Sequence, residues 1–142
     1  MAEAAYDKEC IALAQLETAL RLFTEGQDLF SAITLAGAAD EILGKLVTSR
    51  GGESALNSLT NASAAIHQHL FGEHGDRKGF ADRANLARNA LKHLEAGGMP
   101  TVNLDLRQEA VDLLNRAVAN YWTLKTSLTP AMEAFSRGQR AP

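Results

Sequence analysis

The sequence is poor in the residues that build sheets, disulfides and metal sites. Of its 142 residues, 6% are aromatic, three are proline and one, Cys10, is cysteine. A single cysteine excludes an internal disulfide and suits a reducing compartment, so we expect the chain to be cytoplasmic. No Cys/His pattern of the kind that binds zinc is present, and we expect neither a metal nor another cofactor.

Long apolar runs and a basic N-terminus are also missing. No run approaches the roughly 18 residues that a membrane-spanning helix needs, so we expect no membrane partner. The first residues carry an acid, Glu3, where a signal peptide would carry lysine or arginine. The net charge is −3, so nucleic-acid binding would need a local basic patch, and nothing points to DNA as a partner.

What the chain does contain is a composition and a spacing typical of helices. Hydrophobic residues make up 46% of it, and no proline falls inside a periodic segment. The spacing predicts five helices, at residues 6–23, 28–48, 53–71, 79–94 and 105–124. A short helix is expected from Pro130, followed by a frayed tail at 137–142. We therefore expect one domain over 1–142 that is all-α, an antiparallel bundle of about five helices plus a short C-terminal helix.

Apolar side chains recur every three or four residues on one face of each predicted helix. In the third helix this face holds Leu56, Leu59, Ile66 and Leu70, and we expect it to lie in the core. The second helix carries an unbroken run of small residues, 36–39, which would let another backbone approach closely. Helices with small-residue faces leave apolar surface to cover, so we expect a homodimer.

The segment 77–93 is the one local basic stretch in this acidic chain. It holds five lysine or arginine residues and a single acid, Asp82. On a helix, its polar side chains that can donate hydrogen bonds gather on one stripe opposite the apolar face: Asn85, Arg88, Asn89, Lys92 and His93. Such a stripe is typical of a solvated helix face. It also fits an anion site, because arginine can grip a phosphate with two donors and histidine can move a proton near neutral pH.

The run Arg88-Asn89-Ala-Leu-Lys-His93 resembles the R-x4–6-H motif of HEPN domains, in which a polar residue follows the arginine. These are helical nucleotide-binding domains, and the helical layout of this chain is similar to theirs. In that family the motif marks metal-independent ribonucleases of toxin and antiviral systems, whose two subunits bring their motifs together. The resemblance implies that Arg88 holds the scissile phosphate, that His93 acts on the 2′-hydroxyl or leaving oxygen, and that Asn89 orients them. Some members of the family have lost catalysis and serve as interaction modules.

An acid, Asp40, falls in the otherwise apolar series of the second predicted helix. A buried carboxylate must be paired with an opposite charge. Arg83 is expected on the apolar side of the fourth helix, where its cation would likewise need a partner. We predict that Asp40 or its neighbour Glu41 meets an arginine or His93 from that helix. In the catalytic version the acid orients His93. In the structural version, which we favour, the ion pair fixes the register of the helices.

Other side chains are weaker candidates. His67 and His69 are two residues apart and point in opposite directions on a helix, so they cannot chelate one metal together. Cys10 has no basic neighbour in sequence and is expected to be inert. Tyr121 and Trp122 are expected in the core or at a dimer interface.

Three functions stay open at this point. The first, which base rates favour, is a dimeric interaction or regulatory module of HEPN-like type with a protein partner. The second is a metal-independent endoribonuclease that acts on RNA through the motif across a dimer. The third is a nucleotide or small-anion binding protein, in which Asn85, Lys92 and Arg83 would add contacts to the motif.

Overall fold

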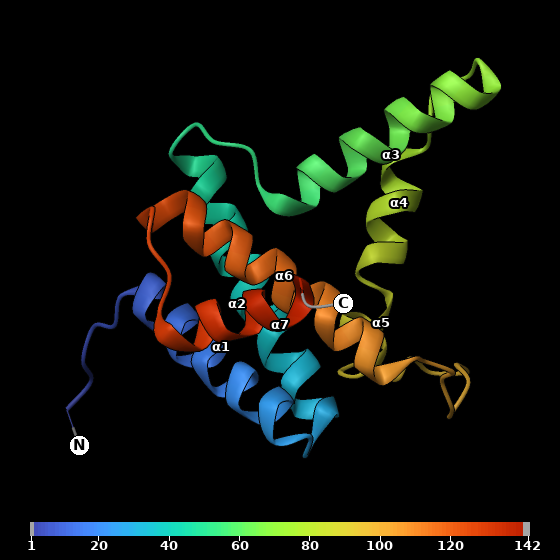
Figure 1. The fold of residues 1–142 in the computed structure, drawn as a ribbon. Coiled ribbons are helices and arrows are strands. Elements are labelled where there is room, and N and C mark those ends of the chain that lie inside the picture. The colour runs from blue at the N-terminus through green and yellow to red at the C-terminus, as the bar shows by residue number, and fades with distance from the viewer. Residues whose placement is uncertain (1, 141–142) are drawn as a thin grey trace.

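Seven helices make up the part of the chain that the computed structural model describes, residues 2–140 (Figure 1). They are α1 (Lys8–Glu25), α2 (Leu29–Ser49), α3 (Ala55–Phe71), α4 (Arg77–Ala84), α5 (Leu86–Ala90), α6 (Leu106–Lys125) and α7 (Pro130–Arg140). No strand occurs among these residues, so the all-α prediction is confirmed. None of the described helices combines the length and the apolar character needed to cross a membrane.

The helix boundaries follow from capping residues in the sequence. An aspartate or serine side chain accepts a hydrogen bond of 2.8–3.2 Å from a first-turn backbone N–H at the start of five helices: Asp7, Asp28, Ser54, Asp76 and Asp105. α7 extends to Arg140, so residues 137–140 are helical and not part of a tail. Residues 141–142 of the expected tail lie outside the described part.

α1, α2, α6 and α7 pack around one hydrophobic core and form the body of the molecule (Figure 1). On its three long helices, apolar residues at steps of three and four are buried: Leu16, Leu20, Phe23, Ile33, Ala36, Leu43, Val47, Ala110, Leu113, Ala117 and Tyr121. α2 and α6 run in the same direction, because Arg116 lies beside Asp40 and Asn120 lies beside Gly44. The body therefore differs from the expected bundle in having one parallel pair of neighbours.

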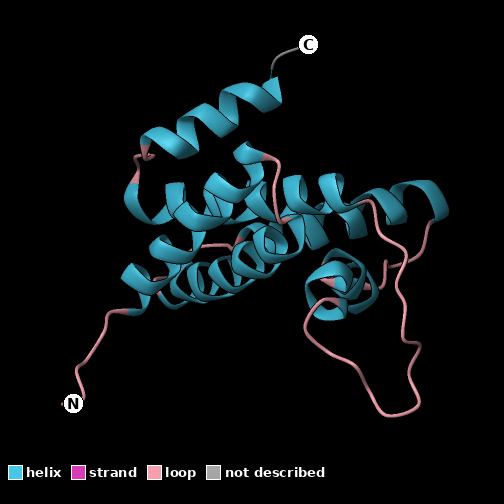
Figure 2. Cartoon of the chain, turned by 90° about the horizontal axis from the view of Figure 1, so that it is seen from below, coloured by secondary structure: helices cyan, strands magenta, loops and turns pink. Residues whose placement is uncertain are grey.

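The remaining helices, α3 to α5, form an arm that leaves the body after α2 and returns before α6 (Figure 1). α3 and α4 pack on each other, and the start of α3 and the short α5 contact the body. A long loop, 91–105, joins the arm to α6 and projects from the molecule (Figure 2). α3 and α4 thus extend away from the core that holds the other helices together, whereas Ala87 of α5 is buried in that core.

The predicted core face of α3 is wrong. Leu59, Ile66 and Leu70 are 44%, 60% and 65% exposed, whereas Thr60 and Ala64 on the other side are buried. Short side chains let α4 and the chain leading to it approach α3 closely. The packed side is therefore the one with small residues, and the apolar stripe faces outward.

Candidate functional site

The basic segment does not form the single helix predicted over 79–94. α4 ends at Ala84 and α5 begins at Leu86, with Asn85 between them at φ −103° and ψ 3°. Arg116 of α6 stabilises this break. Its Nη1 donates to the Ala84 carbonyl at 2.9 Å and its Nη2 donates to Asn85 Oδ1 at 2.8 Å. In a continuous helix that carbonyl would accept from the N–H of Arg88 instead.

Arg88 and His93 lie in different surroundings. α5 ends at Ala90, so His93 lies in the loop that follows, where its side chain is exposed. Arg88 lines a cavity of about 490 Å³, whereas His93 and Lys92 line a separate hollow of about 500 Å³ formed by 90–102. The expectation that one helix carries both side chains on a single stripe is therefore wrong, because the helix breaks at Asn85 and stops before the histidine.

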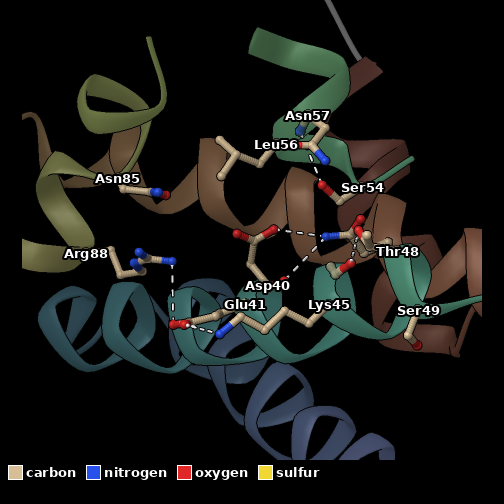
Figure 3. A pocket seen from close by; sticks show the side chains of 12 residues that line it. Asp40, Glu41, Lys45, Thr48, Ser49, Ser54, Leu56, Asn57, Asn85 and Arg88 are labelled. Carbon is tan, nitrogen blue, oxygen red and sulfur yellow. Dashed lines mark hydrogen bonds and ion pairs between the residues drawn. The ribbon is translucent and has the colours of Figure 1, made fainter. Parts of the chain in front are cut away.

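The cavity beside Arg88, here the polar cavity, lies between α2, the start of α3, α5 and α6 (Figure 3). Nearly all of its lining side chains carry hydrogen-bond donors or acceptors: Asp40, Glu41, Lys45, Thr48, Ser49, Ser54, Asn57, Asn85, Arg88 and Asn120, with Gly44 and Leu56. Its volume falls within the range of small-molecule sites. Of the predicted site residues, Asp40, Glu41, Asn85 and Arg88 come together here.

Asp40 is buried and forms the centre of a polar network beneath this cavity. Its carboxylate accepts hydrogen bonds from Arg116 Nη2 and, at 3.0 Å, from Asn120 Nδ2. Asn120 Oδ1 in turn accepts from the backbone N–H of Ala55 at 2.8 Å. Burial raises the pKa of the Asp40 carboxyl, and the nearby charge of Arg116 opposes that rise only in part. The network joins α2 and α6 to the start of α3 and, through Arg116, to the junction of α4 and α5.

The predicted pairing of an acid on α2 with an arginine of the basic segment occurs at Glu41. Its Oε2 lies 3.8 Å from Arg88 Nη1, and its Oε1 accepts from Lys45 Nζ at 3.0 Å. The hydrogen bond from Lys45 and the charge of Arg88 lower the pKa of the Glu41 carboxyl. Asp40 pairs with Arg116 of α6, so the expectation of a partner from the basic segment is wrong for this acid.

The Arg88 side chain is held against α2 but is not fully hydrogen-bonded. It is 14% exposed, and its stem crosses Gly37, where an added Cβ would lie 2.4 Å from Arg88 Cγ. Its Nε donates to Asn89 Oδ1 at 3.3 Å. Its terminal nitrogens have no hydrogen-bond acceptor among the described residues, since the 3.8 Å approach to Glu41 is too long. A guanidinium held in this way can bind an oxyanion that enters the polar cavity.

Two predicted contributors lie away from the polar cavity. Arg83 is exposed, and its guanidinium lies 5.2 Å from the centre of the Phe80 ring. The expectation of an apolar environment for Arg83 is wrong, because α4 packs mainly on α3 and leaves this position on its outer side. Asn89 is exposed beside Arg88.

Sequence reasoning missed two residues of the polar network, Arg116 and Asn120. They are four residues apart on α6 and lie among the apolar positions Leu113, Ala117 and Tyr121. A polar pair with helical spacing on an apolar face was the signal that could have found them. The isolated acid of α2, Asp40, is the partner that a buried cation on α6 would need.

One histidine of α3, His67, has structural contacts. His67 Nδ1 lies 3.3 Å from the Glu73 carbonyl, and its ring packs against Phe71. Within residues 2–140, no three histidine, cysteine, aspartate or glutamate side chains are arranged to hold a metal ion.

No family model matches the chain, and comparisons with curated proteins and with solved structures likewise give no match.

Proposed function

We propose that the chain is a dimeric interaction or regulatory module of HEPN-like type. The observation that carries this proposal is the separation of Arg88 from His93 into two hollows, with Arg88 ion-paired to Glu41. A ribonuclease that uses these groups needs both of them beside one phosphodiester. Arg88 instead packs its stem on Gly37 of α2 and pairs with Glu41.

The exposed apolar surface also supports a role in binding. Leu59, Ile66 and Leu70 face outward from the arm. Such a row of large apolar side chains on one helix is typical of a surface that another chain covers. Two copies of this chain are the expected arrangement.

RNA cleavage in the presence of a metal chelator tests the proposal. The matched set is the wild type, Arg88→Ala, His93→Ala and the control Lys78→Ala, which removes an exposed cation paired with Asp82. We expect the same background signal from all four proteins. Cleavage by the wild type that is lost in Arg88→Ala and His93→Ala and kept in the control would overturn the proposal. The alternative, a metal-independent endoribonuclease of toxin or antiviral type acting across a dimer, would then hold.

A second candidate, a nucleotide or small-anion binding protein, is favoured by the terminal nitrogens of Arg88. They border the polar cavity without a protein acceptor among the described residues. Positive charge is in excess around Asp40 and Glu41, because Arg88, Lys45 and Arg116 pair with these two acids. The charge of Lys92 also acts on Glu41. An oxyanion in the polar cavity would meet this excess charge and the free donors of the guanidinium.

Thermal unfolding tests the second candidate. Inorganic phosphate or a nucleoside monophosphate at about 10 mM should raise the melting temperature of the wild type, as any ligand of the native state does. Arg88→Gln should abolish the rise, and the control Lys78→Gln should keep it. If neither probe shifts the wild type, or if both variants lose the shift equally, the polar cavity is not an anion site.

A further inference from the structure

α3 carries an apolar face that is largely exposed beyond the first turn of the helix. At about 100° per residue, five positions fall within one sector of roughly 80°, and they are Ala55, Leu59, Ala62, Ile66 and Leu70. The buried residues Thr60 and Ala64 lie on the opposite side. α3 therefore packs on the arm through one side and presents a continuous apolar row on the other.

This helix also lacks formal charge. None of its 17 residues is Asp, Glu, Lys or Arg, whereas each of the other six described helices contains at least one of these. Charge resumes at Glu53 and Glu73, just outside its two ends. A helix face exposed to water normally carries charged side chains, so the composition of α3 is that of a covered helix.

The stability of α3 points the same way. An isolated helix of this length is marginal in water, and α3 contains Asn, Ser, Thr and His, which are weak helix formers. Only two of its residues, Thr60 and Ala64, are buried within the chain. Burial of the outward row would therefore supply stabilisation that the chain's own contacts with α3 do not.

We propose that α3 pairs antiparallel with α3 of a second copy of this chain, with the twofold axis beside Ala62, between positions 62 and 63. Leu59 and Ile66 lie three residues before and four after Ala62, and Ala55 and Leu70 lie seven before and eight after. Because the row is nearly the same in both directions, Leu59 meets the partner's Ile66. A symmetric interface requires this self-complementarity.

The charge and size of the face fit a second copy. The chain carries a net charge of −3, so two copies repel each other overall, and an uncharged face such as that of α3 adds no local repulsion where they meet. Small side chains at the axis let the two backbones approach closely. A helix of this length spans about 25 Å, which makes a small interface, and we expect a dissociation constant of roughly 1–100 μM.

This inference deepens the proposed function and rests on its dimeric part. Sedimentation of the wild type, Ile66→Lys and Phe30→Lys over about 1–300 μM tests the dimer and the pairing of α3. Phe30 is a matched control, because it is also a large exposed apolar residue. It lies at the start of α2, and α3 follows the other end of that helix. We expect the wild type and Phe30→Lys to dimerise, and Ile66→Lys to associate at least about 100-fold more weakly, since a charge would enter the apolar row.

The outcomes separate the two statements. A wild type that stays monomeric over the whole range overturns both the pairing of α3 and the dimeric module. A dimer that Ile66→Lys leaves unchanged overturns the pairing of α3 alone. Since Ile66 is largely exposed, the variant should keep its fold, which far-ultraviolet circular dichroism checks.

Disulfide trapping provides a second measurement that does not depend on a charged substitution. In a Cys10→Ser background, Ala62→Cys should form a disulfide-linked dimer on oxidation, because the two copies of this position lie beside the axis. Gln68→Cys is the control, since it is exposed on the same helix but lies about 120° away around it. Equal trapping at both positions, or none at Ala62→Cys, contradicts the proposed pairing.

Discussion

The body and the arm of this molecule are both helical, yet they are held by different forces. In the body, α1, α2, α6 and α7 bury a shared set of large apolar side chains. In the arm, α3 buries only Thr60 and Ala64, α4 buries no residue completely, and α5 adds one small side chain, Ala87, to the core of the body. Hydrogen bonds from Arg116 and Asn120 join the arm to the body at Ala84, Asn85 and Ala55. The comparison shows that apolar spacing predicts a helix reliably but does not reveal what its apolar face will contact.

The largest expected effect comes from cutting the polar network that joins the two regions. Arg116→Leu removes the hydrogen bonds to Ala84 and Asn85 and leaves the buried Asp40 without its cation. Loss of one partner of a buried ion pair should lower the free energy of unfolding by about 3–5 kcal/mol. Chemical denaturation measures this loss, and hydrogen exchange should show faster opening of the arm than of α1.

The exposed pair on α7 provides the control for that change. Arg137 lies 3.8 Å from Glu133, and both side chains are largely exposed. Arg137→Leu should therefore change the free energy of unfolding by less than about 0.5 kcal/mol. If Arg116→Leu costs as little as this control, the polar network does not hold the arm to the body.

Two leucine truncations distinguish the packing of the body from that of the arm. Leu16 is fully buried in α1, and Leu59 lies on the outward face of α3. Leu16→Ala should lower the free energy of unfolding by about 2–5 kcal/mol through lost burial and a cavity. Leu59→Ala, measured on dilute monomer, should stay within about 0.5 kcal/mol of the wild type. An equal loss at both positions would mean that the face of α3 is covered within the chain.

The sequence predicts most of the body and much less of the arm. In α1, α2 and α6, apolar residues at steps of three and four identify the core side, because helices in a bundle bury one stripe each. In α3 the same signal points to the wrong contact, since the row around Leu59 and Ile66 faces outward. The break at Asn85 was not predictable from its own segment. It depends on Arg116, which is 31 residues away in the chain.

The candidate site was predicted in the same uneven way. An acid among apolar residues indicated that Asp40 would be buried and paired, and it is. Its partner could not be read from the basic segment, because the partner lies on α6. The motif residues Arg88 and His93 are close in sequence, but the end of α5 separates their surroundings. Local spacing therefore identified the residue types, and the tertiary fold decided which of them meet.

A smaller effect is expected where the arm touches the body through Gly37. An added Cβ there would lie 2.4 Å from Arg88 Cγ and 2.6 Å from its Cδ, so Gly37→Ala must displace the arginine stem. The gain in helix propensity, about 1 kcal/mol, is offset by this clash, and we expect a net loss of about 1 kcal/mol. Gly138→Ala in α7, where nothing lies within 4 Å, should instead be neutral or stabilising. Stabilisation by both substitutions would mean that Arg88 is free to leave α2.

The smallest effect is a pH dependence that distinguishes the buried acid of α2 from the exposed acid that caps its start. Burial raises the pKa of Asp40 above its ordinary 3.8, so as pH falls the folded state takes up this proton before the unfolded state does. The contribution of Asp40 to the free energy of unfolding should therefore increase as pH falls through its raised pKa toward 3.8. Asp28 behaves oppositely, because hydrogen bonds from Ser31 lower its pKa, and its contribution is lost below 3.8.

Urea unfolding between about pH 7 and pH 3 measures both signs. The stability difference between the wild type and Asp40→Asn should move in favour of the wild type on acidification, whereas the difference between the wild type and Asp28→Asn should move against it. If the Asp40 difference also moves against the wild type, the charge of Arg116 outweighs burial. The link between arm and body would then be a stabilising ion pair. If the stability difference instead moves in favour of the wild type, the ionised Asp40 lowers stability and is retained because it fixes where the arm docks.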